Sequence, residues 1–491
     1  MIVQQFFVRG LAHSSYLLGG TNGCAIVDPR RDVQIYLDAA RELNLKITHI
    51  LETHLHADFV SGHLELAEAT GAQIYTSQAS DCDFEHIVVA EGDLIELDDL
   101  LLQVLETPGH SPSDVCYVVF DHARGAEPAA VFTGDTLFVG DVGRPDLFPG
   151  RARELAAKLY DSLHQKLLTL PDFCEIYPAH GAGSLCGKAM SAKRSSTVGY
   201  EKRYNAALQI EDRELFIELM TTDLPAIPDH FGRCNEINRR GPALIRDLAP
   251  VRPLDPGIFR ESSERHGTLV LDVRGYEAYS GQHLPDSFHI SLRGNFGTFA
   301  GWVLPDVEIL LVADDGDQAQ EAAVWLRRVG LDRIVGYLDG STAAWANAGL
   351  PIDFVGLVSA DRLHQMSIGE QVFVLIDTRS PTVYKASHIE GAINIPTPEF
   401  RTRYRELDPD IPVVLVCNSG QQSSLAASIL RQHGFRHLLN AAGGMRGYVA
   451  AGYALECPVC ANPHGPRFLG ERESLDMEVA ETLKTRDATQ V

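Results

Sequence analysis

Four apolar segments within the first 180 residues each end in a short motif that carries histidine or aspartate. Each segment has the length and composition of a buried strand, and strands that end at one edge of a sheet bring such side chains together. Imidazole and carboxylate ligands suit iron, zinc or manganese, whereas calcium and magnesium prefer oxygen ligands alone. A single H-x-H could be a solvated loop that matches by chance, but the repeated placement predicts a metal site. The motifs are Thr53-His54-Leu55-His56-Ala57-Asp58, Thr107-Pro108-Gly109-His110, Gly134-Asp135 and Pro178-Ala179-His180-Gly181.

The order of these motifs resembles the metal-binding order of the metallo-β-lactamase superfamily. The resemblance implies an αββα sandwich with the metal at one edge of two packed sheets, as the first part of a multidomain α/β chain. Two-zinc hydrolases of that superfamily, such as glyoxalase II, carry a histidine directly after the aspartate of the first motif. Phe59 holds that position here and cannot bind a metal, which leaves Asp58 and His180 at best for a second site.

The remaining ligand set resembles that of the persulfide dioxygenases within the superfamily. The resemblance implies one mononuclear Fe(II) per chain, held by His54, His110 and Asp135. Two imidazoles and one carboxylate leave adjacent positions on the metal open for O2 and for a substrate sulfur. The groups expected to orient these ligands, or else only to hydrogen-bond one another near the surface, are His56, Asp58 and His180.

Basic side chains that follow the metal motifs could hold an anionic substrate. Segment 140–146 resembles the G-x-G-R segment of the persulfide dioxygenases, and its Arg144 could bind a carboxylate through two hydrogen bonds. Lys193 and Arg194 precede a second family-like segment, 195–201, although a solvated basic loop also explains these two residues.

The segment after the last metal motif bears on the thiol carrier. Residues 181–188 lack the Asp-Tyr pair that glutathione-specific members carry there, and their form resembles dioxygenases fused to rhodanese domains. The carrier, of glutathione or coenzyme A type, therefore stays open. Cys186 could handle persulfide sulfur, but a small buried thiol is the favoured interpretation.

The second half of the chain contains an internal repeat. Residues 269–274 (LVLDVR) recur as 374–379 (VLIDTR), and 283–287 (HLPDS) recur as 388–392 (HIEGA). Alternating strands and helices over about 100 residues predict a small α/β unit with a parallel sheet in each copy. The D-x-R, H-I-x-G-A-x-N-I-P and G-G-M motifs resemble those of rhodanese (sulfurtransferase) domains.

The second copy places Cys417 between a predicted strand and a predicted helix. In rhodanese domains this loop directs backbone N–H groups at the cysteine sulfur, and such groups stabilise a thiolate or persulfide anion. Cys417 is therefore the expected nucleophile rather than a structural thiol. The first copy has Ala313 at this position and is expected to be an inactive spacer or docking module. The residues expected to contact substrate are Asn418, Ser419, Gly420, Gln421 and Gln422, the last standing where many rhodaneses have arginine.

At 491 residues the chain is too long for a single core. Its last segment is a charged tail that includes a C-x-x-C pair, Cys457 and Cys460, interpreted as tail thiols. The predicted parts are an iron dioxygenase domain at 1–235, a linker at 236–256, a rhodanese-like domain without catalytic cysteine at 257–353, a catalytic rhodanese domain at 354–456 and a tail at 457–491.

Charge and composition exclude several classes of partner. The net charge of −24 argues against nucleic acid or an anionic membrane. No apolar run reaches about 18 residues and no signal peptide is evident, so no membrane span is expected. Nine cysteines without a regular framework fit a reducing compartment, and the cytoplasm is the expected location. The oligomeric state stays open, a homo-oligomer included.

These features together predict a persulfide (sulfur) dioxygenase that oxidises a low-molecular-weight thiol persulfide with O2 to sulfite. Cys417 would add rhodanese sulfur transfer that makes or uses thiosulfate, in sulfide detoxification. One alternative is a glyoxalase-II-like zinc thioester hydrolase, against which Phe59 argues. The other is a sulfur-carrier or redox-sensing protein in which only Cys417 matters.

Overall fold

The computed structural model describes residues 1–188 and 190–456. The chain divides into two compact units. Unit 1 holds Met1–Ala249 together with Gly294–Asp306 and Ala323–Arg333, and unit 2 holds the remaining segments of the described chain. The predicted pair at Cys457 and Cys460 lies outside the described residues.

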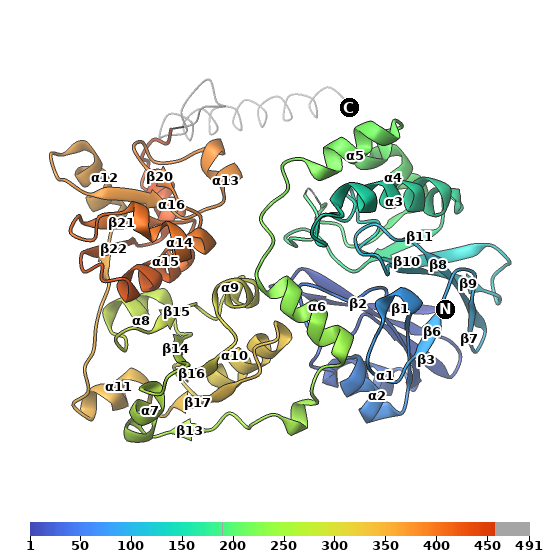
Figure 1. Cartoon of the computed structure of the whole chain (residues 1–491), viewed down its shortest axis with the longest axis horizontal. Coiled ribbons are helices and arrows are strands. Elements are labelled where there is room, and N and C mark those ends of the chain that lie inside the picture. Colours follow the sequence, from blue (N-terminus) through green and yellow to red (C-terminus); the bar gives the residue numbers. More distant parts are fainter. Residues whose placement is uncertain (189, 457–491) are drawn as a thin grey trace, which may run out of the picture. The chain divides into compact units, whose positions relative to one another are not determined.

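Unit 1 contains two six-stranded mixed sheets, in the orders β1-β2-β3-β4-β5-β6 and β12-β11-β10-β9-β8-β7 (Figure 1). The strands of the first sheet are β1 (Ile2–Val8), β2 (His13–Gly19), β3 (Gly23–Val27), β4 (Lys46–Leu51), β5 (Gln73–Ser77) and β6 (Ile87–Val89). Those of the second are β7 (Leu94–Leu97), β8 (Leu100–Glu106), β9 (Val115–Asp121), β10 (Pro128–Gly134), β11 (Glu175–Pro178) and β12 (Ser196–Thr197). The helices of the unit's first segment, up to residue 240, are α1 (Gln34–Glu42), α2 (His63–Thr70), α3 (Ala152–Gln165), α4 (Val198–Tyr204), α5 (Arg213–Thr221) and α6 (His230–Arg240), with short turns η1 (Gln78–Ser80), η2 (Leu167–Thr169) and η3 (Ala207–Gln209).

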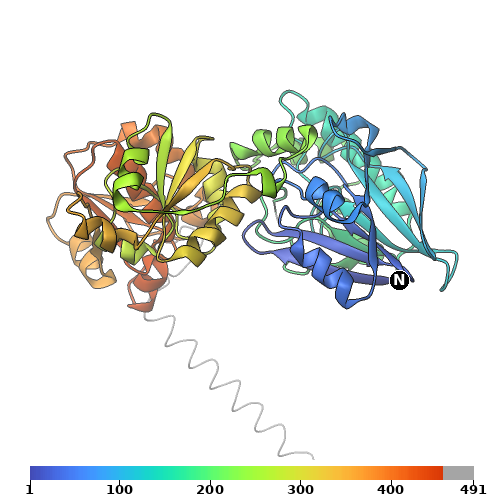
Figure 2. The same ribbon diagram turned by 90° about the horizontal axis from the view of Figure 1, so that it is seen from below.

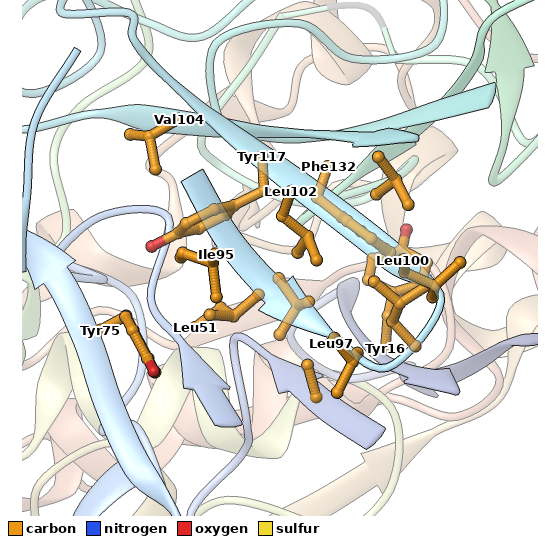
Figure 3. Close-up of a cluster of buried hydrophobic side chains, with 14 of the residues drawn as sticks. Tyr16, Leu51, Tyr75, Ile95, Leu97, Leu100, Leu102, Val104, Tyr117 and Phe132 are labelled. Atoms are coloured by element: carbon orange, nitrogen blue, oxygen red, sulfur yellow. The ribbon is translucent and has the colours of Figure 1, made fainter. Parts of the chain in front are cut away.

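Three hydrophobic layers hold these elements together. The central layer lies between the sheets, where Tyr16 of β2, Leu102 of β8 and Phe132 of β10 face one another (Figure 3). A second layer packs α1 and α2 against the outer face of the first sheet. The third packs α3 against the second sheet through leucines spaced four residues apart, among them Leu159 and Leu163. Helix, sheet, sheet and helix layers confirm the predicted αββα sandwich.

The sandwich brings its ligand-bearing loops to one edge because β4 and β10 each end there in the chain direction. Strand β10 pairs in parallel with β11, so the residues after Gly134 and after Pro178 emerge side by side. The carboxyl ends of neighbouring parallel strands meet at the same edge of a sheet, which is where polar ligands gather. This topology explains why motifs more than 100 residues apart in sequence can form one site.

The predicted linker is partly structured. Residues 236–240 belong to α6, and Cys234 and Asn238 on this helix are buried. Further along, η4 (Ile245–Asp247) precedes β13 (Pro253–Leu254), which pairs in parallel with β17 of the first rhodanese copy. Segment 236–256 contains four prolines, which is typical of a linker, but proline is tolerated in an edge strand such as β13.

The repeat predicted in the second half is confirmed by two sheets of identical strand order, whose strands are labelled in Figure 1 and seen from below in Figure 2. Their orders, β13-β17-β16-β14-β15 and β18-β22-β21-β19-β20, correspond strand for strand, and every pairing is parallel. The first copy has β13, β14 (Thr268–Asp272), β15 (Phe288–His289), β16 (Glu308–Val312) and β17 (Ile334–Leu338), with α7 (Pro256–Ser263), α8 (Tyr276–Gly281), α9 (Phe296–Val303), α10 (Gly316–Arg328) and α11 (Ser341–Asn347). The second has β18 (Gly356–Val358), β19 (Val374–Asp377), β20 (Ile393–Asn394), β21 (Val413–Val416) and β22 (Leu438–Ala441), with α12 (Ala360–Ile368), α13 (Pro381–Ala386), η5 (Thr397–Glu399), α14 (Phe400–Arg403), η6 (Tyr404–Glu406), α15 (Gln421–Gln432) and α16 (Gly444–Ala450). Among the described residues, none of the helices combines the length and the apolar composition that crossing a bilayer requires.

Candidate functional site

His54, His110 and Asp135 converge at the edge of the sandwich. All three are buried, and their ligand atoms lie within 4.8 Å of one another. His110 Nε2 is 3.3 Å and His54 Nε2 is 3.9 Å from Asp135 Oδ2. That carboxylate oxygen is buried and has no hydrogen-bond partner among the described residues. The structure therefore assembles the trio that the sequence predicted.

Hydrogen bonds behind the two imidazoles fix which nitrogen faces the centre of the trio. Thr53 Oγ1 donates to Asp28 Oδ2 at 2.9 Å, so it can only accept from His54 Nδ1, which lies 3.0 Å away. His110 Nδ1 lies 3.0 Å from the carbonyl oxygen of Arg144, which accepts its proton. Burial and the neighbouring His56 also hold the pKa of His54 well below its ordinary value. Neutral rings protonated at Nδ1 offer Nε2 as a ligand.

His180 lies between two carboxylates. Its Nδ1 is 2.7 Å from Asp135 Oδ1 and its Nε2 is 2.8 Å from Asp58 Oδ2. Burial alone would lower the pKa of His180, but the charges of Asp135 and Asp58 outweigh it and raise the pKa well above its ordinary value. His180 thus orients Asp135 from behind, which matches the geometry expected of a residue beside the ligands.

A second group of potential ligands adjoins the first. Asp58, His180 and Cys186 place one ligand atom each within 4.8 Å of one another, and all three are buried. Burial, followed by the charges of Asp135 and Asp58, raises the pKa of Cys186 well above its ordinary value. From the sequence we expected Asp58 and His180 at best here; Cys186 joins them because the turn at 181–187 returns it to His180. Phe59 is fully buried and packs against His56, with 4.4 Å between ring centroids.

His56 packs against His54, and its Nε2 lies near two acidic residues that the sequence motifs did not reveal. Its Nε2 lies 3.2 Å from Asp28 Oδ1 and 3.8 Å from Glu52 Oε2. Burial would lower the pKa of His56, but Asp28 and Glu52 together raise it. Glu52 stands between the end of β4 and the first motif, so its position was visible in the sequence, but its pairing was not.

Side chains of helix α6 hydrogen-bond to the backbone of the loop that carries the first motif, residues 53–61, which we call the metal loop. Asn238 Nδ2 donates to the carbonyl oxygens of His56 and Phe59, both at 2.8 Å, and Ser61 N donates to Asn238 Oδ1 at 2.8 Å. One turn earlier, Asn235 Nδ2 donates to the Leu55 carbonyl oxygen at 3.0 Å. No pattern in the sequence linked α6 to a loop about 180 residues before it.

His13 is another buried residue that the sequence analysis did not identify. Its ring lies 4.0 Å from that of Phe59 and 5.6 Å from that of His180, measured between centroids. Neither ring nitrogen has a hydrogen-bond partner among the described residues. Burial holds the pKa of His13 well below its ordinary value, so the ring is neutral beside the second group of ligands.

The three basic residues predicted to bind substrate differ in their exposure to solvent. Arg144 is buried, and its guanidinium binds Asp146 through two hydrogen bonds of 2.7 and 2.8 Å. It also donates to the carbonyl oxygens of Leu185 and Pro225. The predicted substrate contact of Arg144 would have to displace these partners. Lys193 and Arg194 are exposed and lie over the rings of Tyr200 and Phe7, respectively.

In the second rhodanese copy, Cys417 directly follows β21 and α15 begins at Gln421, as the strand–cysteine–loop–helix pattern predicted. The Gly420 N–H donates to Cys417 Sγ at 3.1 Å, and the Ser423 hydroxyl lies 3.3 Å from the same sulfur. Asn440 Nδ2 donates to the Gly420 carbonyl oxygen at 2.9 Å and holds the loop closed. The remaining predicted contact residues, Asn418, Ser419, Gln421 and Gln422, line this loop and the start of the helix.

The glycine pair Gly443-Gly444, at the start of α16, lies next to the Cys417 backbone. Met445 N donates to the Cys417 carbonyl oxygen at 2.7 Å, and a Cβ on Gly444 would lie 2.2 Å from that oxygen. Gly444 also has a φ of +58°, which favours glycine. The first copy has no equivalent thiol, because Ala313 follows β16 and Asp315 caps the next helix by accepting from Gln318 N.

Comparisons with known proteins agree with both halves of this description. Residues 8–180 match the Metallo-beta-lactamase superfamily, and residues 255–348 and 359–451 each match the Rhodanese-like domain. Over 229 residues the chain is 32% identical to "Persulfide dioxygenase ETHE1, mitochondrial" of Bos taurus, covering 45% of this chain and 80% of the relative. Over 249 residues it is 33% identical to a hydroxyacylglutathione hydrolase of Rhodopseudomonas palustris, covering 49% of this chain and 88% of that relative.

Among solved structures, a metallo-beta-lactamase from Staphylococcus aureus is similar over more than the first domain. It is 35% identical, superposes with a TM-score of 0.62, and the match covers 68% of this chain and 98% of that one. The ligand trio at the edge of an αββα sandwich, the cysteine loop and these matches agree with one another. The chain therefore belongs to the metallo-β-lactamase superfamily, as a homologue of the ETHE1 persulfide dioxygenases that carries two rhodanese-like domains after its first domain.

Proposed function

We propose that the protein is an iron persulfide dioxygenase coupled to sulfur transfer. The first domain would convert a thiol persulfide, O2 and water into the free thiol and sulfite, so that the terminal sulfur is oxidised and O2 is reduced. The second rhodanese copy would combine sulfite with sulfane sulfur carried on Cys417 to give thiosulfate, or run the reverse transfer. The thiol carrier, of glutathione or coenzyme A type, and the cytoplasmic location stay predictions.

The residues present fit a metal ion. Asp135 Oδ2 is buried without a hydrogen-bond partner among the described residues, and the lone pairs of His54 Nε2 and His110 Nε2 face the same region. A buried unpaired carboxylate oxygen is costly, and a cation bound there would remove that cost. When bound, Fe(II) would supply the redox chemistry that joins O2 to the persulfide sulfur.

The chain's own residues would hold and shield this centre. Thr53 and the Arg144 carbonyl oxygen keep His54 and His110 in the tautomer that binds a metal, and His180 holds Asp135. Phe59, with no exposed surface, fills the position where a histidine would add a ligand. A mononuclear centre with open positions is the arrangement that a dioxygenase requires.

The transfer step at Cys417 needs no external oxidant. A Cys417 persulfide would be attacked at its outer sulfur by sulfite, the S–S bond would break, and the bonding pair would remain on Cys417 Sγ as the thiolate leaves. The Gly420 N–H, 3.1 Å from Sγ, is placed to stabilise the negative charge of both the Cys417 persulfide and the Cys417 thiolate.

Convergence of His54, His110 and Asp135 carries the proposal, and oxygen uptake tests it. Iron-loaded protein given glutathione persulfide should consume O2 and form sulfite, and a His110→Ala variant should lose both. Cys417→Ser should leave O2 uptake unchanged but remove thiosulfate formation. Absence of uptake with both glutathione and coenzyme A persulfides, despite one bound iron per chain, would refute the dioxygenase.

One observation favours a second candidate, a two-metal thioester hydrolase. Asp58, His180 and Cys186 form a ligand group beside the first, and hydroxyacylglutathione hydrolases are among the relatives. Hydrolysis of S-lactoylglutathione by zinc-loaded protein under anaerobic conditions, with two metal ions per chain, would support this candidate. One metal per chain with no thioester hydrolysis would exclude it.

A further inference from the structure

Both rhodanese copies contribute to unit 2, and their internal alignment singles out one residue. Asp272 and Arg274 in the first copy correspond to Asp377 and Arg379 in the second. Tyr276, the first residue of α8, then stands opposite Pro381, the first residue of α13. The copy that lacks a thiol therefore carries an aromatic side chain that the copy with Cys417 lacks.

Tyr276 contacts both turns that frame Cys417. A Cβ on Gly420 would lie 2.8 Å from Cζ and 2.9 Å from Cε2 of Tyr276, so the ring packs directly against this buried glycine. Its hydroxyl accepts a hydrogen bond from Gly443 N at 3.1 Å. Gly420 N donates to Cys417 Sγ, and Gly443 lies two residues before Met445, whose N–H binds the Cys417 carbonyl oxygen. One side chain thus touches both the sulfur-binding loop and the turn behind it.

Contacts along α15 hold Tyr276 in this position. His289 N, in the first copy, donates to Ser428 Oγ on α15 at 3.1 Å. Asp353, in the segment that joins the copies, forms an ion pair with Arg431 on the same helix, with 2.7 Å between Arg431 Nε and Asp353 Oδ2. Helix α15 begins at the Cys417 loop, so the contacts that align the copies also align Tyr276 with the thiol.

Access to Cys417 is narrow. Its side chain has 1% of its surface exposed, and Tyr276 is only partly buried. A ring that covers Gly420 blocks approach over that side of the loop, where a bulky thiol would need room. Sulfite and thiosulfate are small anions that require much less space and can be held by backbone N–H groups.

We propose that Tyr276 is a specificity-determining residue of the Cys417 site, which favours small sulfur oxyanions over tripeptide-sized thiols in sulfur exchange. The inference rests on the proposed sulfur transfer at Cys417. It also gives the first rhodanese copy a role other than that of a spacer, because it supplies one wall of the active site.

Alkylation of Cys417 tests the wall without relying on catalysis. The full chain would be treated with iodoacetamide and with a fluorescein-sized iodoacetamide, and the modification of Cys417 followed by mass spectrometry. Tyr276→Ala should raise the rate with the bulky reagent by about tenfold and leave the small reagent nearly unchanged, because a pocket wall excludes by size. Tyr276→Phe keeps the ring and should behave as the wild type does.

Tyr337 provides a matched control. Its hydroxyl lies beside Gly316 in the corresponding loop of the first copy, where a Cβ on Gly316 would be 2.8 Å from Oη. Tyr337→Ala should change neither rate. Tyr276→Leu, together with circular dichroism, would show that an effect of Tyr276→Ala does not come from misfolding. An unchanged ratio of bulky to small alkylation in both Tyr276 variants would overturn the inference.

Sulfur transfer measured on the same variants separates this inference from the proposed function. Tyr276→Ala should lower the KM for glutathione as acceptor while the KM for sulfite stays within about twofold, since only the bulky acceptor meets the wall. If the alkylation ratio shifts but the protein transfers no sulfur, the proposed sulfurtransferase activity is refuted while the size restriction by Tyr276 is supported. Normal transfer with unchanged acceptor preference would refute the wall alone.

Discussion

Replacement of Asn238 by alanine should loosen the metal loop. Asn238 is 1% exposed and makes three hydrogen bonds of 2.8 Å to the backbone of the loop. Alanine would leave the carbonyl oxygens of His56 and Phe59 and the N–H of Ser61 without this partner. Each unsatisfied buried group costs about 1–3 kcal/mol, and relaxation of the loop makes the sum less than additive. We therefore expect the free energy that keeps the loop folded to fall by about 3–5 kcal/mol.

Two measurements follow the loop directly. Hydrogen exchange of residues 54–61 should become at least about 100-fold faster in metal-free protein, because 1.4 kcal/mol corresponds to a factor of ten. Competition with a chelator should show weaker iron binding, since the loop that carries His54 must then be ordered by the metal. Asn238→Asp, which keeps the acceptor for Ser61 N but removes both donors, should also weaken binding.

Asn235 gives the internal control for this reasoning. It lies one helical turn before Asn238 and makes a single hydrogen bond to the loop, at 3.0 Å to the Leu55 carbonyl oxygen. Asn235→Ala should cost about 1 kcal/mol, a typical net value for one hydrogen bond. If both alanine variants accelerated loop exchange equally, or if neither changed iron affinity, the hydrogen bonds of Asn238 would have no special role.

Three further outcomes are expected. Burial would raise the pKa of Asp353, but the hydrogen bond and charge of Arg431 outweigh burial and lower it. The stabilisation from this ion pair is therefore present above the ordinary carboxyl pKa and is lost as the pH falls through the lower pKa of the folded state. Asp353→Asn should lower the thermal unfolding midpoint at pH 7 but not at pH 2. Gly444→Ala should abolish sulfur transfer and leave O2 uptake intact, because a Cβ would lie 2.2 Å from the Cys417 carbonyl oxygen. Removal of iron by a chelator should stop O2 uptake while Cys417 still transfers sulfur from thiosulfate to cyanide.

The sequence was sufficient for the parts of the site that follow strand ends. His54, His110 and Asp135 each come within four residues of the end of a strand, and the edge of a sheet brings strand ends together irrespective of their distance along the chain. Cys417 was predictable for a similar reason, since a strand and a helix flank it closely. Both predictions depended on local pattern combined with one rule of topology.

Residues that act through tertiary packing were beyond this reasoning. Asn238 stands on a helix that composition assigned to the edge of a linker, and its partners lie 177 to 182 positions earlier. Cys186 reaches His180 only because the intervening turn folds back. Arg144 was predicted to face substrate, but its side chain is buried against Asp146, and no pattern in the sequence distinguishes a buried guanidinium from an accessible one.

The two rhodanese copies separate the framework of that fold from its chemistry. Both copies have the same buried ion pair at the end of their second strand in chain order, β14 or β19. Arg274 binds Asp272, and Arg379 binds Asp377, each through two or more hydrogen bonds. Breaking one such buried pair would leave an uncompensated charge in the core, so the pair is needed for folding whether or not the copy is active. The loop after the fourth strand, β16 in the first copy and β21 in the second, carries no such pair, and a buried alanine, Ala313, stands there in place of the thiol. A copy freed from catalysis in this way can still supply Tyr276 to the active loop of the other copy, and this contact depends on the framework that both copies share.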